Sequence, residues 1–339
     1  MSPAVLSPVT QASNDFVAAH LVGAAAIGER MADLVRDPVA FVAATQHGFE
    51  TLADPVYADG SRSIAPGLGP ILGVRFPLME AVDKTFKRGT RDTPTSLLVD
   101  AMDRLLRQDL RELRWFGIWN LGRLLPTDPE RTWQLLRGAA RRSDEWITVD
   151  TLAHPYGEGI LRDPRRWAEI EQLVYSPSRW ERRLVGSTIA TLPHVRGISG
   201  GRSPMVVERG LALVGGLMGD AEPDVQKALS WALRALAQLD QAAAAGFLAA
   251  EAETARRNDD GHRAWAIRDS LSKLPDDTAA VLRDRLAGIR RRPGAPSTSH
   301  AAAASAGFFQ AIDGGDAADA VDAGGAPRPA QSPGRQGAP

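Results

Sequence analysis

The chain has 339 residues, and its 40 Lys and Arg residues nearly balance its 41 Asp and Glu residues, giving a formal net charge of −1 at pH 7. This balance excludes the overall basic excess that is the simplest mark of a nucleic-acid-binding protein, so a DNA-binding surface would need basic residues gathered on one face. The absence of Cys excludes disulfides, zinc fingers and thiol chemistry. No signal-peptide pattern and no run of eighteen apolar residues occurs, so we expect a cytoplasmic protein without a membrane span.

Apolar residues recur every three or four positions along almost the whole chain, and this spacing predicts helices. The first helices are expected at residues 14–36 and 38–53, followed by a Pro- and Gly-rich loop at 54–70. The next are expected at 76–88, 94–108, 110–125, 129–142, 145–162, 164–175 and 178–192. After a second loop at 195–204, the last are expected at 205–218, 222–239, 241–257, 260–273 and 277–291.

Helices of this length joined by short turns, with no strand between them, predict an all-α fold of antiparallel helix pairs. Units of this kind build HEAT-like repeats, so we expect a curved α-solenoid, with a compact helical bundle as the alternative. We divide the chain into N-terminal helices and loop (1–70), a repeat core (71–293) and a tail (294–339). The tail is rich in Ala, Gly, Pro, Ser and Asp, a composition that predicts disorder.

Four tryptophans have a polar residue one helical turn away, which places both side chains on the same helix face. An ordinary explanation covers each pair, because a helical Trp usually packs in the core and a neighbouring Arg extends across its ring to water. Spacing alone therefore does not define a site. The four pairs are Trp146 with Asp150, Trp180 with Arg183, Trp231 with Arg234, and Trp115 with Glu112.

Several segments resemble the AlkD-like DNA alkylation repair family. Trp146–Asp150 is similar to its Trp-Asp-Thr-Val-Asp segment, and Trp180–Arg183 is similar to its Trp-x-x-Arg helix start. The most specific match is Val225–Arg234, which resembles the family's Gln-Lys-Ala-Ile-Gly-Trp-x-Leu-Arg segment. Weaker matches are Gly73–Pro77 and His262–Ile267. The matches occur in the family's order, from about residue 73 to residue 274.

Members of this family are HEAT-like solenoids whose concave face holds duplex DNA, and they hydrolyse the glycosidic bond of cationic alkylpurines. The resemblance therefore implies a monofunctional DNA glycosylase, expected to be monomeric, with double-stranded DNA carrying alkylated bases as its partner. It implies no metal and no cofactor, and a lesion read without a deep base pocket. The implied site comprises Asp150 as the catalytic carboxylate, Trp146 and Trp231 as aromatic walls, and Arg183, Arg234, Arg182 and Lys227 as DNA-binding residues.

These residue types suit the chemistry that the resemblance implies. Alkylation at N3 or N7 gives the purine a positive charge and makes it a good leaving group, so the remaining barrier is a sugar that becomes cationic. A carboxylate beside the sugar stabilises that charge and orients the attacking water. Indole faces attract a nearby cation, and Arg binds phosphate in a bidentate manner.

The chain departs from the family pattern on either side of Trp146. Ile147 stands where the family often has Asp, and we expect it to project away from the face that carries Trp146 and Asp150. Glu145 stands where a second Trp is common, and we expect it to bring negative charge close to the DNA-binding surface. For His154, the residue before Pro155, we expect a capping role.

Two other functions fit the same sequence. One is a HEAT-like protein that binds branched or distorted DNA without excising a base, although a protein without activity has no reason to keep Asp150, Trp146 and Trp231 together. The other is a protein-interaction scaffold, the commonest use of helical solenoids, which the balanced charge favours. A continuous basic face would favour DNA binding over a scaffold, and its expected members are Arg183, Arg234 and Lys227.

Overall fold

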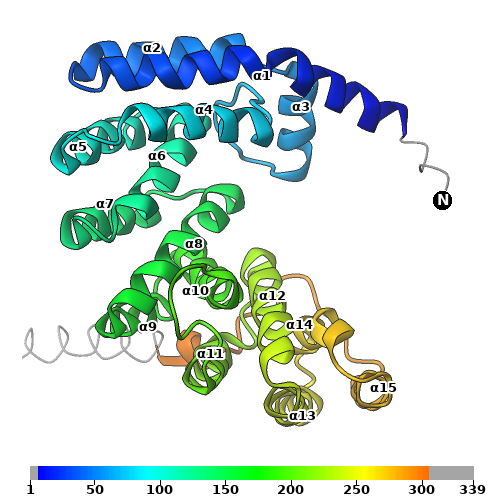
Figure 1. Cartoon of the computed structure of the whole chain (residues 1–339). Coiled ribbons are helices and arrows are strands. Elements are labelled where there is room, and N and C mark those ends of the chain that lie inside the picture. The colour runs from blue at the N-terminus through cyan, green and yellow to red at the C-terminus, as the bar shows by residue number, and fades with distance from the viewer. Residues whose placement is uncertain (1–6, 305–339) are drawn as a thin grey trace, which may run out of the picture.

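The computed structural model describes residues 7–304, and within this range the chain contains helices and no strand (Figure 1). None of the helices described is long and apolar enough to cross a membrane. The α-helices are α1 (Pro8–Leu34), α2 (Pro38–Thr51), α3 (Pro55–Ile64), α4 (Phe76–Gly89), α5 (Thr95–Leu106), α6 (Arg111–Leu124), α7 (Pro129–Arg141), α8 (Trp146–Arg162), α9 (Trp167–Leu173), α10 (Arg179–Thr191), α11 (Pro204–Leu217), α12 (Pro223–Leu239), α13 (Gln241–Asn258), α14 (Gly261–Ser270) and α15 (Asp276–Arg285). Short 3-10 turns occupy Pro164–Arg166, Leu192–His194 and Leu271–Lys273.

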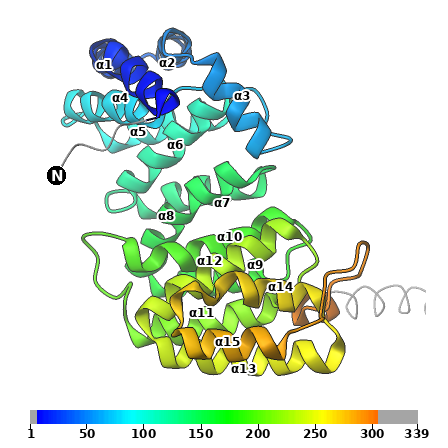
Figure 2. The ribbon, with the colours of Figure 1, turned by 90° about the vertical axis from the view of Figure 1, so that its right-hand side faces the viewer.

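The helices stack in neighbouring pairs to form two rows. The even-numbered helices α6, α8, α10, α12 and α14 form one row in which each contacts the next, and the odd-numbered helices from α5 to α13 pack against that row. The stack curves, so that α3 and α12 lie toward opposite ends of an arch (Figures 1 and 2). The prediction of an α-solenoid is confirmed, and the alternative of a compact bundle is wrong.

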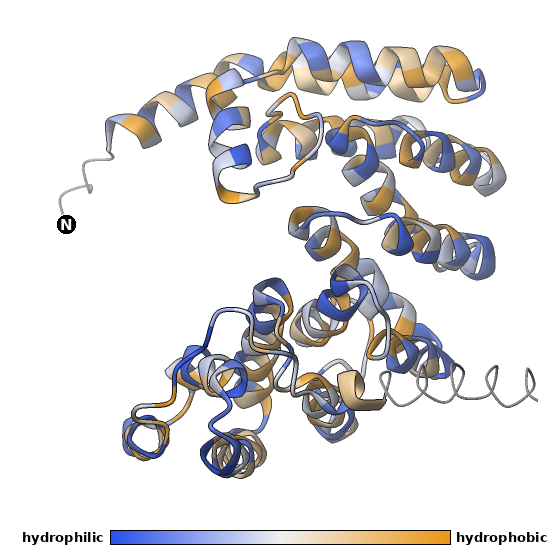
Figure 3. Cartoon of the chain, turned by 180° about the vertical axis from the view of Figure 1, so that it is seen from behind, coloured by the Kyte–Doolittle hydropathy of each residue, from blue (hydrophilic) through white to orange (hydrophobic). Residues whose placement is uncertain are grey.

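Helices such as α4, α5, α7 and α12 are clearly amphipathic, and Figure 3 shows apolar and polar residues alternating around the helices of the stack. The apolar faces meet in one large hydrophobic cluster that runs from α1 to residue 301. A second, small cluster consists of Ala58, Ala65, Leu68 and Ile71. This small cluster is separate from the main core, and the partly buried side chains of Trp115, Trp146 and Ile147 pack against it.

The N-terminal helices pack directly on the solenoid. Helix α1 runs along α4, where Thr85 Oγ1 donates to the carbonyl of Ala25 at 2.8 Å. A Cβ on Gly28 would lie only 2.1 Å from the same Oγ1 atom, so this contact requires a residue without a side chain. Helix α1 also contacts α2, and α2 contacts α5 and α6, while the division of the chain at residue 70 stays a prediction.

The loop predicted at residues 54–70 is wrong in part, because α3 occupies Pro55–Ile64. Asp54 caps this helix by accepting from the backbone N–H groups of Val56 and Tyr57, and Pro55 supplies the fixed backbone angle that suits a first helical residue. The Gly and Ser content of the segment predicted a loop, whereas the Asp-Pro pair at its start is a helix-start signal.

The predicted disordered tail also begins too early. Residues 294–304 lie against the solenoid: the Thr298 N–H donates to the Gly219 carbonyl at 2.9 Å, and the His262 ring contacts the Ala295 carbonyl at 3.1 Å. Ser299 and Ala301 are buried. Specific hydrogen bonds to a turn of the body therefore hold a segment whose composition resembles that of a linker. Residues 305–339, which include the two neighbouring phenylalanines of the tail, lie outside the described residues.

Candidate active site

Asp150 lies on the second turn of α8, where α8 packs against α10. Its Oδ1 accepts from Arg183 Nε at 3.1 Å and its Oδ2 accepts from Arg183 Nη2 at 2.7 Å, which makes a bidentate ion pair. The hydroxyl of Ser187, one turn further along α10, donates to Oδ1 at 2.6 Å. Three hydrogen bonds from α10 thus fix the orientation of a carboxylate whose side chain remains 21% exposed.

Arg183 lies beneath Asp150 and not on the open surface, since only 6% of the residue is exposed. Its Nη1 donates to the carbonyl of Asp224 on the first turn of α12 at 2.7 Å, so three of its five N–H donors are used within the protein. The guanidinium carbon lies 5.7 Å from the centre of the Trp146 ring, within cation–π range. The geometry makes Arg183 a positioning residue for Asp150, and its predicted contact with phosphate stays a prediction.

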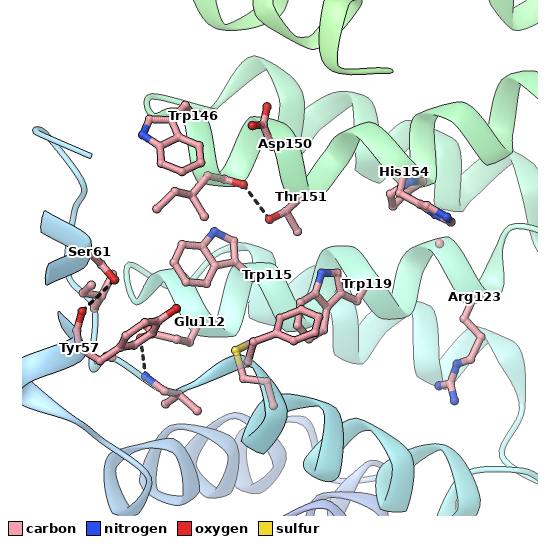
Figure 4. A pocket seen from close by; sticks show the side chains of 18 of the residues that line it. Tyr57, Ser61, Glu112, Trp115, Trp119, Arg123, Trp146, Asp150, Thr151 and His154 are labelled. Atoms are coloured by element: carbon pink, nitrogen blue, oxygen red, sulfur yellow. Dashed lines mark hydrogen bonds between the residues drawn. The ribbon is translucent and has the colours of Figure 1, made fainter. Parts of the chain in front are cut away.

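Asp150 also lines a cavity of about 620 Å³ between α3, α4, α6 and α8 (Figure 4). Trp146, Asp150, Thr151 and His154 extend from α8 in the figure, whereas Trp115 and Trp119 come from α6. Tyr57 and Ser61 come from α3. The indole N–H of Trp115 donates to Thr148 Oγ1 at 2.8 Å. The rings of Trp119 and Phe76 pack edge to face, with 5.1 Å between their centres. The aromatic side chains that line the cavity are Tyr57, Phe76, Trp115, Trp119 and Trp146.

Two ionisable side chains of α6 line the same cavity and are incompletely paired. Glu112 Oε1 accepts from the backbone N–H groups of residues 72–74, but Oε2 is buried and has no hydrogen-bond partner among the described residues. Burial raises the pKa of Glu112 above its ordinary value. The buried Nε and Nη2 atoms of Arg123 have no hydrogen-bond partner among the described residues either. Burial lowers the pKa of the Arg123 guanidinium.

Three expectations about α8 are wrong. Glu145 is only 1% exposed and serves as the N-cap, since its carboxylate accepts from the backbone N–H groups of Ile147 at 2.5 Å and Thr148 at 2.8 Å; it therefore brings little charge to the surface. Ile147 lines the cavity together with Asp150, three residues later on the same face. His154 also lines the cavity, and it caps nothing because α8 continues through Pro155.

The other residues predicted for the site lie outside the cavity lining, on α10 and α12. Trp231, on α12, is half-buried and packs against the main core, and its place beside Trp146 and Asp150 stays a prediction. Arg182 pairs with Asp220 at 2.7 Å, and Arg234 pairs with Asp269 at 2.9 Å. Lys227 is exposed and forms no ion pair within residues 7–304.

Of the five aromatic residues that line the cavity, sequence reasoning assigned only Trp146 to the site, and Trp115 was paired with Glu112 but given no role there. Trp115 and Trp119 are four residues apart on α6, a spacing that places both rings on one helix face, and this was the available signal. Tyr57 was missed because α3 was taken for a loop, and Phe76 because its segment was considered only for its turn. Within the described chain, no group of three or more His, Asp or Glu residues is placed to hold a metal ion.

The comparisons with known proteins agree with the resemblance seen in the Trp-containing segments. A family model described as DNA alkylation repair enzyme matches residues 45–274, a range that begins in α2, includes the whole cavity and ends after α14. A search of curated proteins found no match. Since the family match covers well over half of the chain, the protein belongs to the AlkD-like family of DNA alkylation repair enzymes.

Proposed function

We propose that the protein is a DNA glycosylase that hydrolyses the N-glycosidic bond of cationic alkylated purines, of the 3-methyladenine and 7-methylguanine type, in duplex DNA. The observation that carries this proposal is the position of Asp150. A carboxylate held by Arg183 and Ser187 lies at the edge of an aromatic cavity, in an enzyme of the DNA alkylation repair family. The product would be an abasic site, as in the first step of base excision repair.

The proposed reaction breaks the bond between C1′ of the deoxyribose and the purine nitrogen. The electron pair of that bond stays on the purine and neutralises its positive charge, while positive charge develops on the sugar. The fixed carboxylate of Asp150 stabilises this charge because its orientation needs no rearrangement during the reaction. A water oxygen then bonds to C1′, and the proton that it loses passes to Asp150 or to solvent.

The remaining roles follow from the surroundings of Asp150. Trp146 presents an indole ring next to the ion pair, where it favours a nearby cation and excludes water. Lys227, which is exposed on α12, is proposed to contact a DNA phosphate. For Arg234, the same role requires the phosphate to compete with Asp269. Trp231 would contact the DNA outside the cavity.

The test is base release from DNA treated with a methylating agent, followed by chromatography of the freed bases. Wild-type protein is expected to release 3-methyladenine or 7-methylguanine, whereas Asp150→Asn should bind the same DNA and release neither. A matched control is Asp144→Asn, because Asp144 forms an ion pair with Arg111 but does not line the cavity. Equal release by wild type and Asp150→Asn would overturn the assigned role of Asp150.

One observation favours the protein-interaction scaffold over DNA binding. Arg182, Arg183 and Arg234 all pair with carboxylates, so the continuous basic face expected around them is replaced by mixed charge. Mixed charge in this region is the expected mark of a scaffold. DNA binding by the wild type without release of any methylated base would favour the binding protein, and absence of DNA binding would favour the scaffold.

A further inference from the structure

We propose that Arg291, in the segment that follows α15, contacts a phosphate of the DNA backbone. This inference rests on the proposed function, because it requires DNA as the substrate. It adds a contact beyond the family match, which ends at residue 274. The ligand class is the phosphodiester anion of duplex DNA, and the segment that supplies the contact, residues 290–299, is called the strap below.

The strap follows a fixed path across the solenoid. The Arg290 carbonyl lies against the first residue of α14, since a Cβ on Gly261 would be only 2.1 Å from its oxygen. Further along, the Thr298 N–H donates to the carbonyl of Gly219, in the turn before α12, at 2.9 Å. Contacts with the body on both sides of Arg291 therefore determine where its backbone lies.

The side chain of Arg291 is also held in place, although the residue is exposed. Its Nη1 donates to Gln226 Oε1 at 3.0 Å, and its guanidinium carbon lies 4.6 Å from the centre of the Trp265 ring. The Gln226 amide has a defined orientation, because its Nε2 donates to the Asp220 carbonyl at 2.6 Å and leaves Oε1 free to accept. A guanidinium has five N–H donors, so a pre-oriented Arg291 keeps donors for a phosphate and loses little entropy on binding it.

The charge of Arg291 is available to a ligand. Within residues 7–304 no carboxylate pairs with Arg291, in contrast to Arg182, Arg183 and Arg234. Lys227, the residue after Gln226, is exposed and unpaired in the same range. Two cations therefore lie close to the Gln226 amide, and an anion that binds there does not have to displace a carboxylate first.

Arg291 lies in line with the proposed active site. The fifth residues of α8, α10, α12 and α14 are Asp150, Arg183, Lys227 and Trp265. Each of these helices contacts the next, and the ion pair of Asp150 with Arg183 joins the first two positions. Because Arg291 lies over Trp265, it continues this row beyond Lys227. Duplex DNA carries about one negative charge per 1.7 Å of its axis, so a backbone that follows the row brings a phosphate to Arg291.

The test is the salt dependence of binding to a short unmodified duplex, measured by fluorescence anisotropy between about 50 and 200 mM salt. Arg291→Ala should weaken binding about tenfold at the lowest salt, and it should reduce the slope of log Kd against log salt by about one unit. Arg291→Lys keeps the charge and should keep the slope. Arg291→Gln removes the charge but keeps an amide donor for Gln226, so it decides the question if Arg291→Ala fails to fold in circular dichroism melting.

Two variants control for general charge and for loosening of the strap. Arg292→Ala removes the same charge from the next residue, which is exposed and pairs with Asp259. Thr298→Ala removes the hydroxyl that donates to Asp260 and leaves Arg291 unchanged. Both should keep the wild-type slope.

A wild-type slope in Arg291→Ala and Arg291→Gln, or an equal loss of slope in either control, would overturn the inference. Base release by the wild type in the same preparations would then leave the glycosylase proposal intact. If the wild type binds no DNA, the proposed function fails, and this inference fails with it.

Discussion

Replacement of Arg183 by Met would separate positioning of Asp150 from contact with DNA. The change removes two charge-assisted hydrogen bonds to Asp150 and one hydrogen bond to the Asp224 carbonyl, while keeping an unbranched side chain. Loss of one partner of a buried ion pair costs about 3–5 kcal/mol. Asp150 keeps its bond from Ser187 and is partly exposed, so we expect the lower end, about 3 kcal/mol, in urea unfolding.

The neighbouring variant Arg182→Met is the control for lost stability. Arg182 makes a comparable ion pair with Asp220, whose side chain is only 2% exposed, so its loss should destabilise the fold at least as much. It does not contact Asp150. Under conditions where both variants are folded, Arg183→Met should lower the single-turnover rate of base release by about 100-fold, as expected for a catalytic group displaced by about 1 Å. Arg182→Met should leave this rate close to that of the wild type.

Two quantities are measured for each variant: the single-turnover rate of base release and the affinity for DNA. If Arg183→Met kept the wild-type rate and lost only affinity, the positioning argument would be refuted, and Arg183 would act as the phosphate contact suggested by the family resemblance. If both variants lost the rate equally, reduced stability would explain the result.

Three further predictions concern the fold, the pH dependence and the DNA contacts. Gly28→Ala should destabilise the fold by about 1–3 kcal/mol in urea because its Cβ collides with α4, whereas Gly23→Ala in the same helix, with open space around it, should be neutral or stabilising; equal effects would contradict the packing argument. Burial raises the pKa of Glu112 in the folded protein, so protonated Glu112 stabilises the fold below about pH 4.3, and this contribution is lost as the pH rises through the pKa of the folded state. Glu112→Gln should therefore remove this part of the pH dependence of the free energy of urea unfolding. A pH profile identical to that of the wild type would refute this prediction. Lys227→Ala should reduce the salt dependence of DNA binding by about one unit of slope, while Arg256→Ala, in an exposed ion pair on α13, should not; equal slopes for the two variants would contradict the contact.

The sequence predicts most helices well because their starts carry local signals. Asp37 and Asp128 each precede a Pro and cap the helix that follows, and the predicted starts of those helices agree with the structure. The same signal at Asp54 was outweighed by the Gly and Ser residues that follow it, and α3 was lost. Local composition also failed at Ser299, because its burial depends on a long-range contact with the solenoid.

For the site, the helical spacing of Trp146 and Asp150 predicted that they share one helix face, and both side chains line the same cavity. The partner of Asp150 could not be predicted in the same way. Arg183 lies 33 positions away on another helix, and only the packing of α8 on α10 decides whether it faces Asp150 or solvent. The walls formed by Trp115 and Trp119 likewise become a cavity only once α3 and α4 cover them.

The link from Asp150 through Arg183 to the Asp224 carbonyl joins three successive helices of one row, α8, α10 and α12. Helical solenoids owe their curvature to small rotations between adjacent repeats. Bending of the arch that changes the spacing of these helices would change the geometry of the hydrogen bonds that hold the Asp150 carboxylate. Under the proposed function, a duplex that widens or tightens the arch would in this way shift the group proposed to act at the breaking bond.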